Sequence, residues 1–321
     1  MCIRDSPKTP HAKTPTVVVV TAPRKRGTQE IGGQVLTHPE RLLWPEISDG
    51  PNAGPGVTKA DLARYWQAVA DRALPGIAAR PLAFVRCPDG IEGQQFFQKH
   101  KTRGMPDAIR EAMFDDAPYL AISGTAGLMA AAQIGAIELH TWGCTEADAG
   151  HADRLVFDLD PGDGTPFTDV VAAAKDVRKR LKAHGLAAYP RTSGGKGLHV
   201  VAPISTGADW DMIRTWSRRF AEQMERDDPD RYVSTTRKNR RSGRILIDWL
   251  RNGLGSTAVA SYSPRARPGA TVATPLSWRE VTDTLDPRLF TIQTLPERLR
   301  ASDPWRNFDA DRRDLKPQNK D

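Results

Sequence analysis

The sequence predicts an α/β (α+β) fold whose second half has the order β-α-β-β-α-β, the split arrangement of ferredoxin-like and RNA-recognition folds. Three observations predict it. An apolar run that ends in two aspartates, LVFDLD, precedes a segment with helical periodicity. A glycine-rich stretch, SGGKG, separates two further apolar runs, and a second amphipathic segment precedes the strand-like RILIDWL. In this order the first and last strands lie side by side in one sheet.

Local signals justify each element of the second half. Pro166 is favoured in the first turn of a helix, and Gly185 is favoured just after its end. Apolar residues between them recur at helical spacing and predict one buried stripe. We expect strands at 154–160, 187–192, 198–203, 232–235 and 244–250, with helices over 166–184 and 210–224.

The first half is less regular. Thr58 is a suitable N-cap for a helix whose apolar residues continue to Leu74. Short strands are expected at 81–86 and 93–99, and the run 135–142 closes an alternation of strands with a small-residue helix. The segment SDGPNAGPG between these elements and the N-terminus has the Gly, Pro and Asn content of an exposed loop.

Charge and composition limit the class of protein. The 321 residues carry a formal net charge of +7, which suits a polyanionic partner. No apolar run reaches the roughly eighteen residues that a membrane span needs, so no membrane partner is expected. Three cysteines, Cys2, Cys87 and Cys144, are too few and too scattered for a disulfide framework or a zinc knuckle. We expect a cytoplasmic protein.

Carboxylates cluster at the ends of two expected strands. Residues i and i+2 of a strand point to the same face, so Asp158 and Asp160 lie together, and the topology brings Asp248 opposite them. Without a cation or solvent to offset the repulsion, one carboxyl of the pair should have its pKa raised. Three such carboxylates suit one or two divalent cations. Taken alone, the DPGDG sequence also fits an ordinary turn, and Asp248 a capped strand end.

The stretch SGGKGLHV follows the second expected strand of this half. Its glycines allow a tight turn that brings backbone N–H groups near an anion, while Ser193 and Lys196 add a hydroxyl and a positive charge. His199 follows on the next strand. The spacing is not that of a Walker A motif. A simple hairpin is the alternative, and the expected carboxylates nearby favour phosphate binding instead.

Several motifs together resemble a known family. They are RLVFDLDPGDG, YPRTSGGKGLHVVAPI, GRILIDWLRN and YSPRARPGATVATPLSW, preceded by LTHPERLLWPE, GVTKADLARYW, RPLAFVRCPDG and GAIELHTWGC. From Gly32 to Phe308 they are similar, in this order, to the polymerase domain of bacterial DNA ligase D, in the archaeo-eukaryotic primase superfamily. The resemblance implies a primase-polymerase fold and template-dependent addition of nucleotides, preferably ribonucleotides, to a primer 3′-hydroxyl at double-strand breaks in non-homologous end joining.

The resemblance also implies roles for particular side chains. Two divalent cations, manganese in preference to magnesium, would bind the catalytic carboxylates Asp158, Asp160 and Asp248. The nucleoside triphosphate (NTP or dNTP) would contact Ser193, Lys196, His199, Arg251, Arg265, Arg267 and His140. Without the resemblance, the two arginines of SPRAR could form a solvated turn, and the histidine of ELHTW could be a core residue.

DNA contacts are implied at two further places. Phe96 and Phe97 would stack on bases at the break, although alternation predicts that one of them faces the core. Arg41 and Lys59 would bind the 5′-phosphate across a gap, and the loop between them could disturb that geometry. The basic stretch RKNRRSGR, 237–244, could contact backbone phosphates or be a solvated loop. Ku and a ligase, fused or separate, are expected partners at the nucleoid.

The family resemblance divides the chain. We expect a disordered tail over 1–30, whose opening MCIRDS resembles an assembly scar, a primase-polymerase domain over 31–309 and a tail over 310–321. Within the domain, an N-terminal α/β part over about 31–150 precedes a catalytic core over about 151–275 and a C-terminal arm over about 276–309. Two other functions fit three carboxylates and a basic surface: a metal-dependent phosphodiesterase and a non-catalytic break-bridging module. The cations suited to a triphosphate favour the polymerase.

Overall fold

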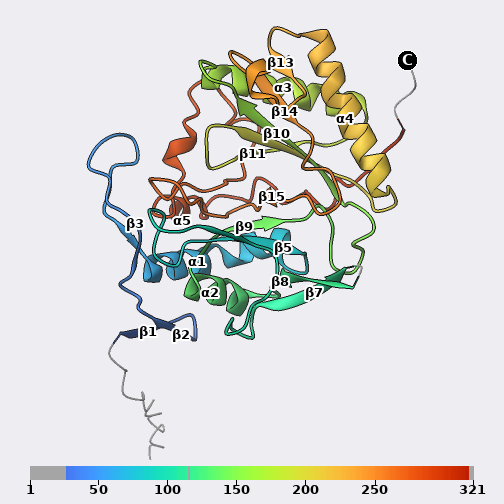
Figure 1. Ribbon diagram of the computed structural model, residues 1–321. Coiled ribbons are helices and arrows are strands. Elements are labelled where there is room, and N and C mark those ends of the chain that lie inside the picture. Colours follow the sequence, from blue (N-terminus) through green and yellow to red (C-terminus); the bar gives the residue numbers. More distant parts are fainter. Residues whose placement is uncertain (1–26, 115, 318–321) are drawn as a thin grey trace, which may run out of the picture.

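The computed structural model describes residues 27–114 and 116–317. Two sheets face each other, and helices cover the outer side of each (Figure 1). The first 26 residues of the expected N-terminal tail lie outside the described part of the chain. The segment Thr28–Ile31, at the end of that expected tail, forms strand β1 and pairs with β2 (Gln34–Thr37).

The first sheet has the order β15-β9-β5-β8-β7, and β6 pairs with β5. Its strands are β5 (Leu82–Arg86), β6 (Phe96–Gln98), β7 (Arg110–Phe114), β8 (Ala117–Ala121), β9 (Ala136–Thr141) and β15 (Ala258–Val259). Helices α1 (Lys59–Ile77) and α2 (Thr125–Gln133) pack on it. Thr58 caps α1 in a capping box with Asp61, as its position before the apolar pattern predicts.

The second sheet has the order β11-β12-β10-β14-β13. Its strands are β10 (Arg154–Pro161), β11 (Tyr189–Thr192), β12 (Leu198–Pro203), β13 (Tyr232–Val233) and β14 (Ile245–Asp248), and its helices are α3 (Phe167–Ala183) and α4 (Trp210–Asp227). The predicted pairing of the first and last strands is confirmed, because β10 is antiparallel to β14. The short β13 is an addition at the edge, parallel to β14.

Alternation along β10 decides which side chains face the cleft between the sheets. Phe157 and Leu159 are fully buried in the core that also contains the apolar stripe of α3. Val156 lies on the opposite face, in a small cluster with Val201 of the neighbouring strand. Asp158 and Asp160 share the face of Val156, because side chains alternate along a strand. They therefore point toward the first sheet.

The chain returns to the first sheet after β14. Strand β15 pairs with β9, and Tyr262 and Val272 belong to the core beneath the first sheet. The C-terminal arm then packs on β11 through Trp305 and Phe308, whose stacked rings have centroids 5.2 Å apart. The helix α5 (Leu295–Arg298) lies within this return. Residues 310–317, expected as tail, also pack on the second sheet, where the backbone of 313 bridges to 204.

Two short strands near the N-terminus bring distant basic residues together. β3 (Leu42–Trp44) pairs with β4 (Val57–Thr58), so the loop expected at 48–56 is an excursion from a hairpin. The backbone N–H of Lys59 donates to the carbonyl of Arg41 at 2.8 Å. The loop therefore does not separate the two residues. Within the described ranges, none of the helices is long and apolar enough to cross a membrane.

Candidate active site

The three predicted carboxylates come together at one end of β10. Asp158 is the direct cross-strand partner of Asp248, and Asp160 is paired with Leu246 two positions further along. Directly opposed residues of antiparallel strands share a face at short range. The side chains of Asp158 and Asp248 are 17% and 10% exposed, whereas that of Asp160 is 48% exposed. One carboxylate of the group thus reaches solvent.

Arg251 stands between the two buried carboxylates. One of its Nη atoms lies 3.4 Å from Oδ2 of Asp158 and 3.2 Å from Oδ2 of Asp248. Burial acts to raise the pKa of Asp158, but the His199 imidazole and Arg251 outweigh it and lower that pKa. Burial raises the pKa of Asp248, where Arg251 only partly opposes it and the Asp158 charge adds to it. The raised pKa expected within the DLD pair therefore occurs on the opposite strand.

A buried arginine that sequence reasoning missed orients His199. Arg191 of β11 is the cross-strand partner of His199, and its guanidinium donates to His199 Nδ1 at 3.0 and 3.2 Å. Since Nδ1 accepts, the neutral ring carries its proton on Nε2, which lies 3.3 Å from Asp158 Oδ1. Burial lowers the pKa of His199 and favours this neutral form. The chain of contacts from Arg191 through His199 therefore holds the Asp158 carboxylate from the β12 side.

The glycine-rich loop is folded by its own serine. Ser193 Oγ accepts hydrogen bonds from the backbone N–H groups of Gly195 and Gly197, each at 3.2 Å. A Cβ at Gly197 would lie 2.3 Å from the carbonyl oxygen of Leu159, so only glycine allows the loop to lie against β10. Lys196 is exposed at the tip. The loop therefore presents its lysine close to the strand that carries the aspartates.

The first sheet supplies the opposite wall. His140 Nε2 lies 2.7 Å from Oε2 of Glu138, two residues earlier on the same face of β9. Glu138 also accepts from the Ala266 backbone at 2.8 Å and lies 3.1 Å from Arg265 Nε. Burial acts to raise the pKa of Glu138, but the hydrogen bond with His140 and the Arg265 charge lower it to about 2. Glu138, which the sequence analysis did not single out, holds His140 and Arg265 together, and both were predicted to contact the nucleotide.

One cavity of about 200 Å³ unites these walls. Nine of the ten residues predicted to bind metal or nucleotide line it, and the tenth, Asp248, is held against it by Arg251. The lining predicted residues are His140, Asp158, Asp160, Ser193, Lys196, His199, Arg251, Arg265 and Arg267. The cavity joins an acidic floor to a cationic rim. Such a site can hold cations and a polyphosphate at the same time.

The basic stretch 237–244 reaches the same carboxylates. Arg241 lies 2.5 Å from Asp160, and Gly162 lets the loop approach, since a Cβ there would be 1.7 Å from the Arg241 carbonyl oxygen. In the described ranges, no three His, Cys, Asp or Glu side chains are arranged to hold one metal ion. Guanidinium groups of Arg241 and Arg251 offset the charge of the three aspartates only in part. The oxygen donor set still fits divalent cations, which prefer carboxylates.

Of the predicted DNA contacts, one aromatic side chain borders the cavity. Phe96 and Phe97 are 40% and 56% exposed, so the expectation that one of them faces the core is wrong. The reason is that β6 is a three-residue strand paired only with β5, and neither face is covered. Phe97 meets the His140 ring edge-on at 5.9 Å between centroids. It therefore borders the nucleotide cavity.

The Arg41–Lys59 pair lies where the β3–β4 hairpin meets the start of α1. Lys59 is 5% exposed, and its ammonium donates to the carbonyls of Thr37 and Gln133 at 2.9 and 3.1 Å. Burial and the neighbouring Arg41 lower its pKa. Arg41, with 40% of its side chain exposed, is the more open of the two. An anion could therefore reach Arg41 more readily than Lys59.

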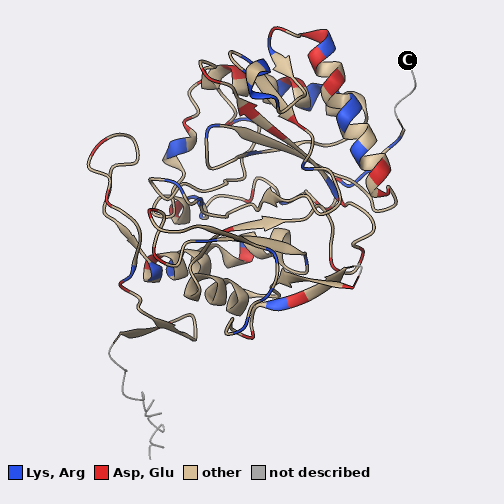
Figure 2. Ribbon diagram, viewed as in Figure 1, with Lys and Arg blue, Asp and Glu red and all other residues tan. Residues whose placement is uncertain are grey.

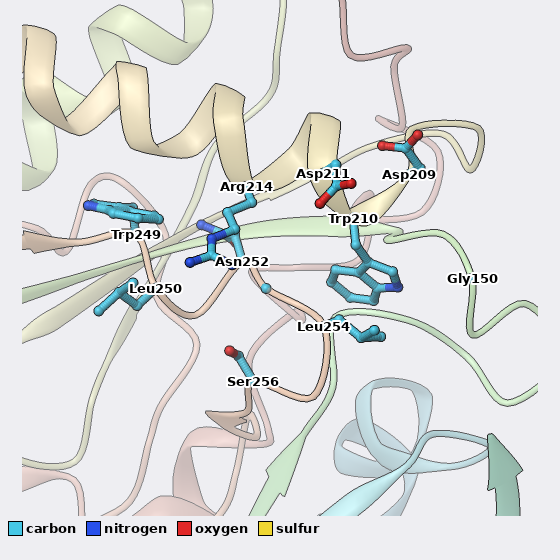
Figure 3. A pocket seen from close by; sticks show the side chains of 11 residues that line it. Gly150, Asp209, Trp210, Asp211, Arg214, Trp249, Leu250, Asn252, Leu254 and Ser256 are labelled. Carbon is cyan, nitrogen blue, oxygen red and sulfur yellow. The ribbon is translucent and has the colours of Figure 1, made fainter. Parts of the chain in front are cut away.

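A second cavity, of about 510 Å³, lies beyond Arg251 between the start of α4 and the loop 249–256. Figure 3 shows Trp210 and Arg214 of α4 facing Leu254 and Asn252 of this loop. The side chain of Asn252 is used within the protein, because it bonds both backbone groups of Val156 at 2.7 and 2.8 Å. Apolar side chains, one arginine and the two aspartates at the start of α4 therefore line the cavity on this side of the three carboxylates.

Comparison with known proteins identifies the family of this chain. The family described as LigD, primase-polymerase domain, matches residues 58–305. The multifunctional non-homologous end joining protein LigD of Pseudomonas aeruginosa is 34% identical over 283 residues, 86% of this chain and 33% of that protein. The bifunctional LigD of Bacillus subtilis is 30% identical over 244 residues, 76% of this chain and 40% of that protein. The chain thus spans a third to two fifths of these relatives.

A solved structure shows the same fold. The polymerase domain of Mycobacterium tuberculosis ligase D, solved in complex with DNA, is 32% identical and superposes with a TM-score of 0.77 over 86% of this chain and 98% of that chain. The mixed α/β fold and the family predicted from the sequence are confirmed. The chain belongs to the LigD primase-polymerase domain family and is a polymerase of the nucleotidyltransferase class.

Proposed function

We propose that this chain extends a primer 3′-hydroxyl against a template in gaps and ends at DNA double-strand breaks, within bacterial non-homologous end joining. One observation carries the proposal: a single cavity joins the aspartates of β10 to the cations of the glycine-rich loop and the SPRAR turn. A phosphodiesterase needs no grip on pyrophosphate, whereas a polymerase must hold and neutralise it. The relatives are longer than the matched region, so a ligase domain, fused or separate, is an expected partner. Ku is expected from the family resemblance.

Asp158, Asp160 and Asp248 would hold two divalent cations, with manganese expected in preference to magnesium. When bound, the cations would lower the pKa of the primer hydroxyl and neutralise the leaving pyrophosphate. Lys196, Arg265 and Arg267 would bind the triphosphate, since guanidinium forks pair with phosphate oxygens. No side chain needs to form a covalent intermediate, so positioning and charge supply the catalysis.

DNA binding is supported by the similar ligase D domain, which was solved with DNA. Phe96 and Phe97, both exposed beside the nucleotide cavity, suit stacking on bases at the break. Arg41 and Lys59 would receive the 5′-phosphate on the far side of a gap. The apolar side chains of the second cavity, Leu250 and Leu254, would border the primer end beyond Arg251.

A primer-extension assay tests the proposal. A labelled primer on a gapped template is incubated with the chain, each divalent cation in turn, and NTPs or dNTPs. We expect template-directed lengthening, faster with manganese and with NTPs. A primer that only shortens would identify a phosphodiesterase, and an unchanged primer that is bound but not extended would identify a bridging module.

A further inference from the structure

An arginine-lined cavity lies outside the catalytic site. It has a volume of about 660 Å³, and its walls come from α1, α3, α5, the turn at 277–280 and the arm at 299–306. It shares no lining residue with the nucleotide cavity among the described residues. The return segment from β15 separates the two, because Ala258 and Arg265 line the nucleotide cavity while Tyr262 lines this one.

The charge of this cavity is one-sided. Five arginines face one glutamate: Arg72, Arg178, Arg279, Arg298 and Arg306 against Glu280. Figure 2 shows the opposite pattern on α4, where basic and acidic residues alternate, four of each. A mixed helix face needs no partner, whereas an excess of like charge at one place is favourable only when an anion is near.

Two of the five arginines form a fixed floor. Arg72 donates to the carbonyls of Leu299 and Ala301 at 2.8 and 2.6 Å. Arg298 is paired with Glu280 and donates to the Pro275 carbonyl at 3.2 Å. These groups hold the arm against the body of the domain. Their positive charges are therefore placed before any ligand arrives.

The remaining three arginines surround the opening. Arg178 lies over the Trp278 ring, with 4.7 Å from its guanidinium carbon to the ring centroid. The side chains of Arg279 and Arg306 are exposed, and within the described part of the chain they make no hydrogen bond or ion pair. Both guanidinium groups are free to pair with an incoming anion.

The chemistry of the lining indicates phosphate rather than a protein surface. Guanidinium groups pair with phosphate oxygens through parallel hydrogen bonds. A protein partner would require an exposed apolar anchor, and none of the large exposed apolar side chains of the described chain lines this cavity. Trp278 is also committed, since its indole N–H donates to Ala188 at 2.6 Å and Arg178 covers its face. Base stacking is therefore not expected here.

We propose that the arginine-lined cavity is a second binding site for the phosphodiester backbone of DNA, outside the catalytic cleft. The inference uses the proposed function only to identify the polyanion as DNA. Contacts of this kind do not read sequence; they lengthen the bound duplex and strengthen binding through release of counterions.

The test uses the double variant Arg279→Ala/Arg306→Ala and the control Lys175→Ala/Lys182→Ala, which removes two exposed cations of α3 outside the cavity. Binding of a short duplex that covers only the cleft and of a longer duplex is measured by anisotropy across salt concentrations, without nucleotide or metal. For the longer duplex, the slope of log K against log salt should become shallower by about 2 units in the arginine variant. The control variant and the short duplex should keep their slopes.

Two results would overturn the inference. Equal slopes for the arginine and lysine variants on the longer duplex would show that the cavity contributes to DNA binding only through the net charge of the protein and is not a binding site. A second titration, with tripolyphosphate followed by calorimetry, separates DNA from free phosphate and counts sites, because the nucleotide cavity is expected to bind one tripolyphosphate of its own. If the arginine variant loses a second tripolyphosphate site but keeps the wild-type DNA slope, the ligand is a free polyphosphate. Neither titration includes catalysis. If the chain failed to extend primers, the results of the DNA and tripolyphosphate titrations would therefore still decide whether the cavity binds DNA.

Discussion

The two ends of β10 carry opposite charge arrangements. Asp153, just before the strand, is 1% exposed and contacts three arginines: Arg80 through two hydrogen bonds of 3.0 and 2.6 Å, Arg154 at 2.9 Å and Arg312 at 3.3 Å. At the other end, three aspartates share two arginines. One strand therefore begins in a closed, cation-rich cluster and ends in an open, acid-rich one.

This difference separates a structural cluster from a functional one. Burial acts to raise the pKa of Asp153, but Arg154 and Arg80 hold it well below its ordinary value, so the carboxylate stays ionised. The opposed pair Asp158 and Asp248 has its pKa values moved in opposite directions. A group of carboxylates that the protein neutralises incompletely retains affinity for added cations. The comparison distinguishes the two ends of the strand: incomplete neutralisation is found at the end where we propose the catalytic site.

The largest effect is expected from Asp158→Asn. Cations stabilise the developing charge by several kcal/mol, so primer extension should fall by at least about a hundredfold. DNA affinity should change little. The free energy of unfolding should fall at neutral pH, because the lowered pKa of Asp158 means that its ionised form stabilises the fold, so extension is compared per folded molecule. Single-turnover extension measures this, with the exposed Asp283→Asn as the control. Unchanged extension in Asp158→Asn would show that the aspartates at this end of β10 are not catalytic.

At the other end, Asp153→Ala should act on stability. It leaves the Arg80 guanidinium, 3% exposed, without its carboxylate, and breaking a buried pair in this way costs about 3–5 kcal/mol. Denaturant unfolding measures the loss, and the fraction that remains folded should extend primers normally. A loss below about 1 kcal/mol, the range of a surface ion pair, would show that the cluster is not structural.

A pH titration sharpens the comparison at Glu138, another buried carboxylate. Its folded pKa of about 2 is depressed, so its ionised form stabilises the fold above its unfolded pKa of about 4.3, and that stability is lost as pH falls toward 2. The contribution at neutral pH is about 3 kcal/mol. Glu138→Gln should therefore be less stable than wild type at pH 7, and the difference should vanish near pH 2. A difference that is independent of pH would reject the assignment.

The smallest effect concerns the contrast between buried Lys59 and the more exposed Arg41, which pairs with Asp89 at 3.3 Å. Filling of a gap that ends in 5′-phosphate should be faster than one that ends in 5′-hydroxyl, by about 1 to 3 kcal/mol in binding. Arg41→Ala and Lys59→Ala should each reduce this preference and spare the carboxylate chemistry. If only Arg41→Ala reduces it, the two carbonyls that hold Lys59 keep that lysine structural. Equal rates on both substrates for wild type would reject the pocket.

The sequence predicted what depends on local periodicity. Alternation along one strand placed Asp158 and Asp160 on a common face, and the order of elements brought Asp248 opposite. Residues whose partners are distant could not be found in this way. Glu138 meets Ala266 across 128 positions, and Arg191 faces His199 only in the register of the hairpin. A glutamate two residues before an expected histidine is a signal of a shared strand face.

Other features depended on packing that no local pattern contains. The pairing of Arg80 with Asp153 joins the two sheets across 73 positions. Arg241 reaches Asp160 because glycine at 162 allows the basic loop to close on the strand. Alternation predicts that one of Phe96 and Phe97 is buried, but both are exposed, since neither face of the short β6 packs into the core.

The central claim is that the acid-rich end of β10 binds the catalytic cations. Titration of manganese, followed by the electron paramagnetic resonance signal of the free ion in the presence of a non-reactive nucleotide analogue, tests it most directly. The reference is the analogue with manganese in buffer, because the triphosphate itself binds the ion. Wild type and the exposed control Asp283→Asn should lower the free-ion signal below this reference, and Asp158→Asn should leave it close to the reference. Manganese binding by Asp158→Asn equal to that of wild type would place the cations elsewhere and contradict the account.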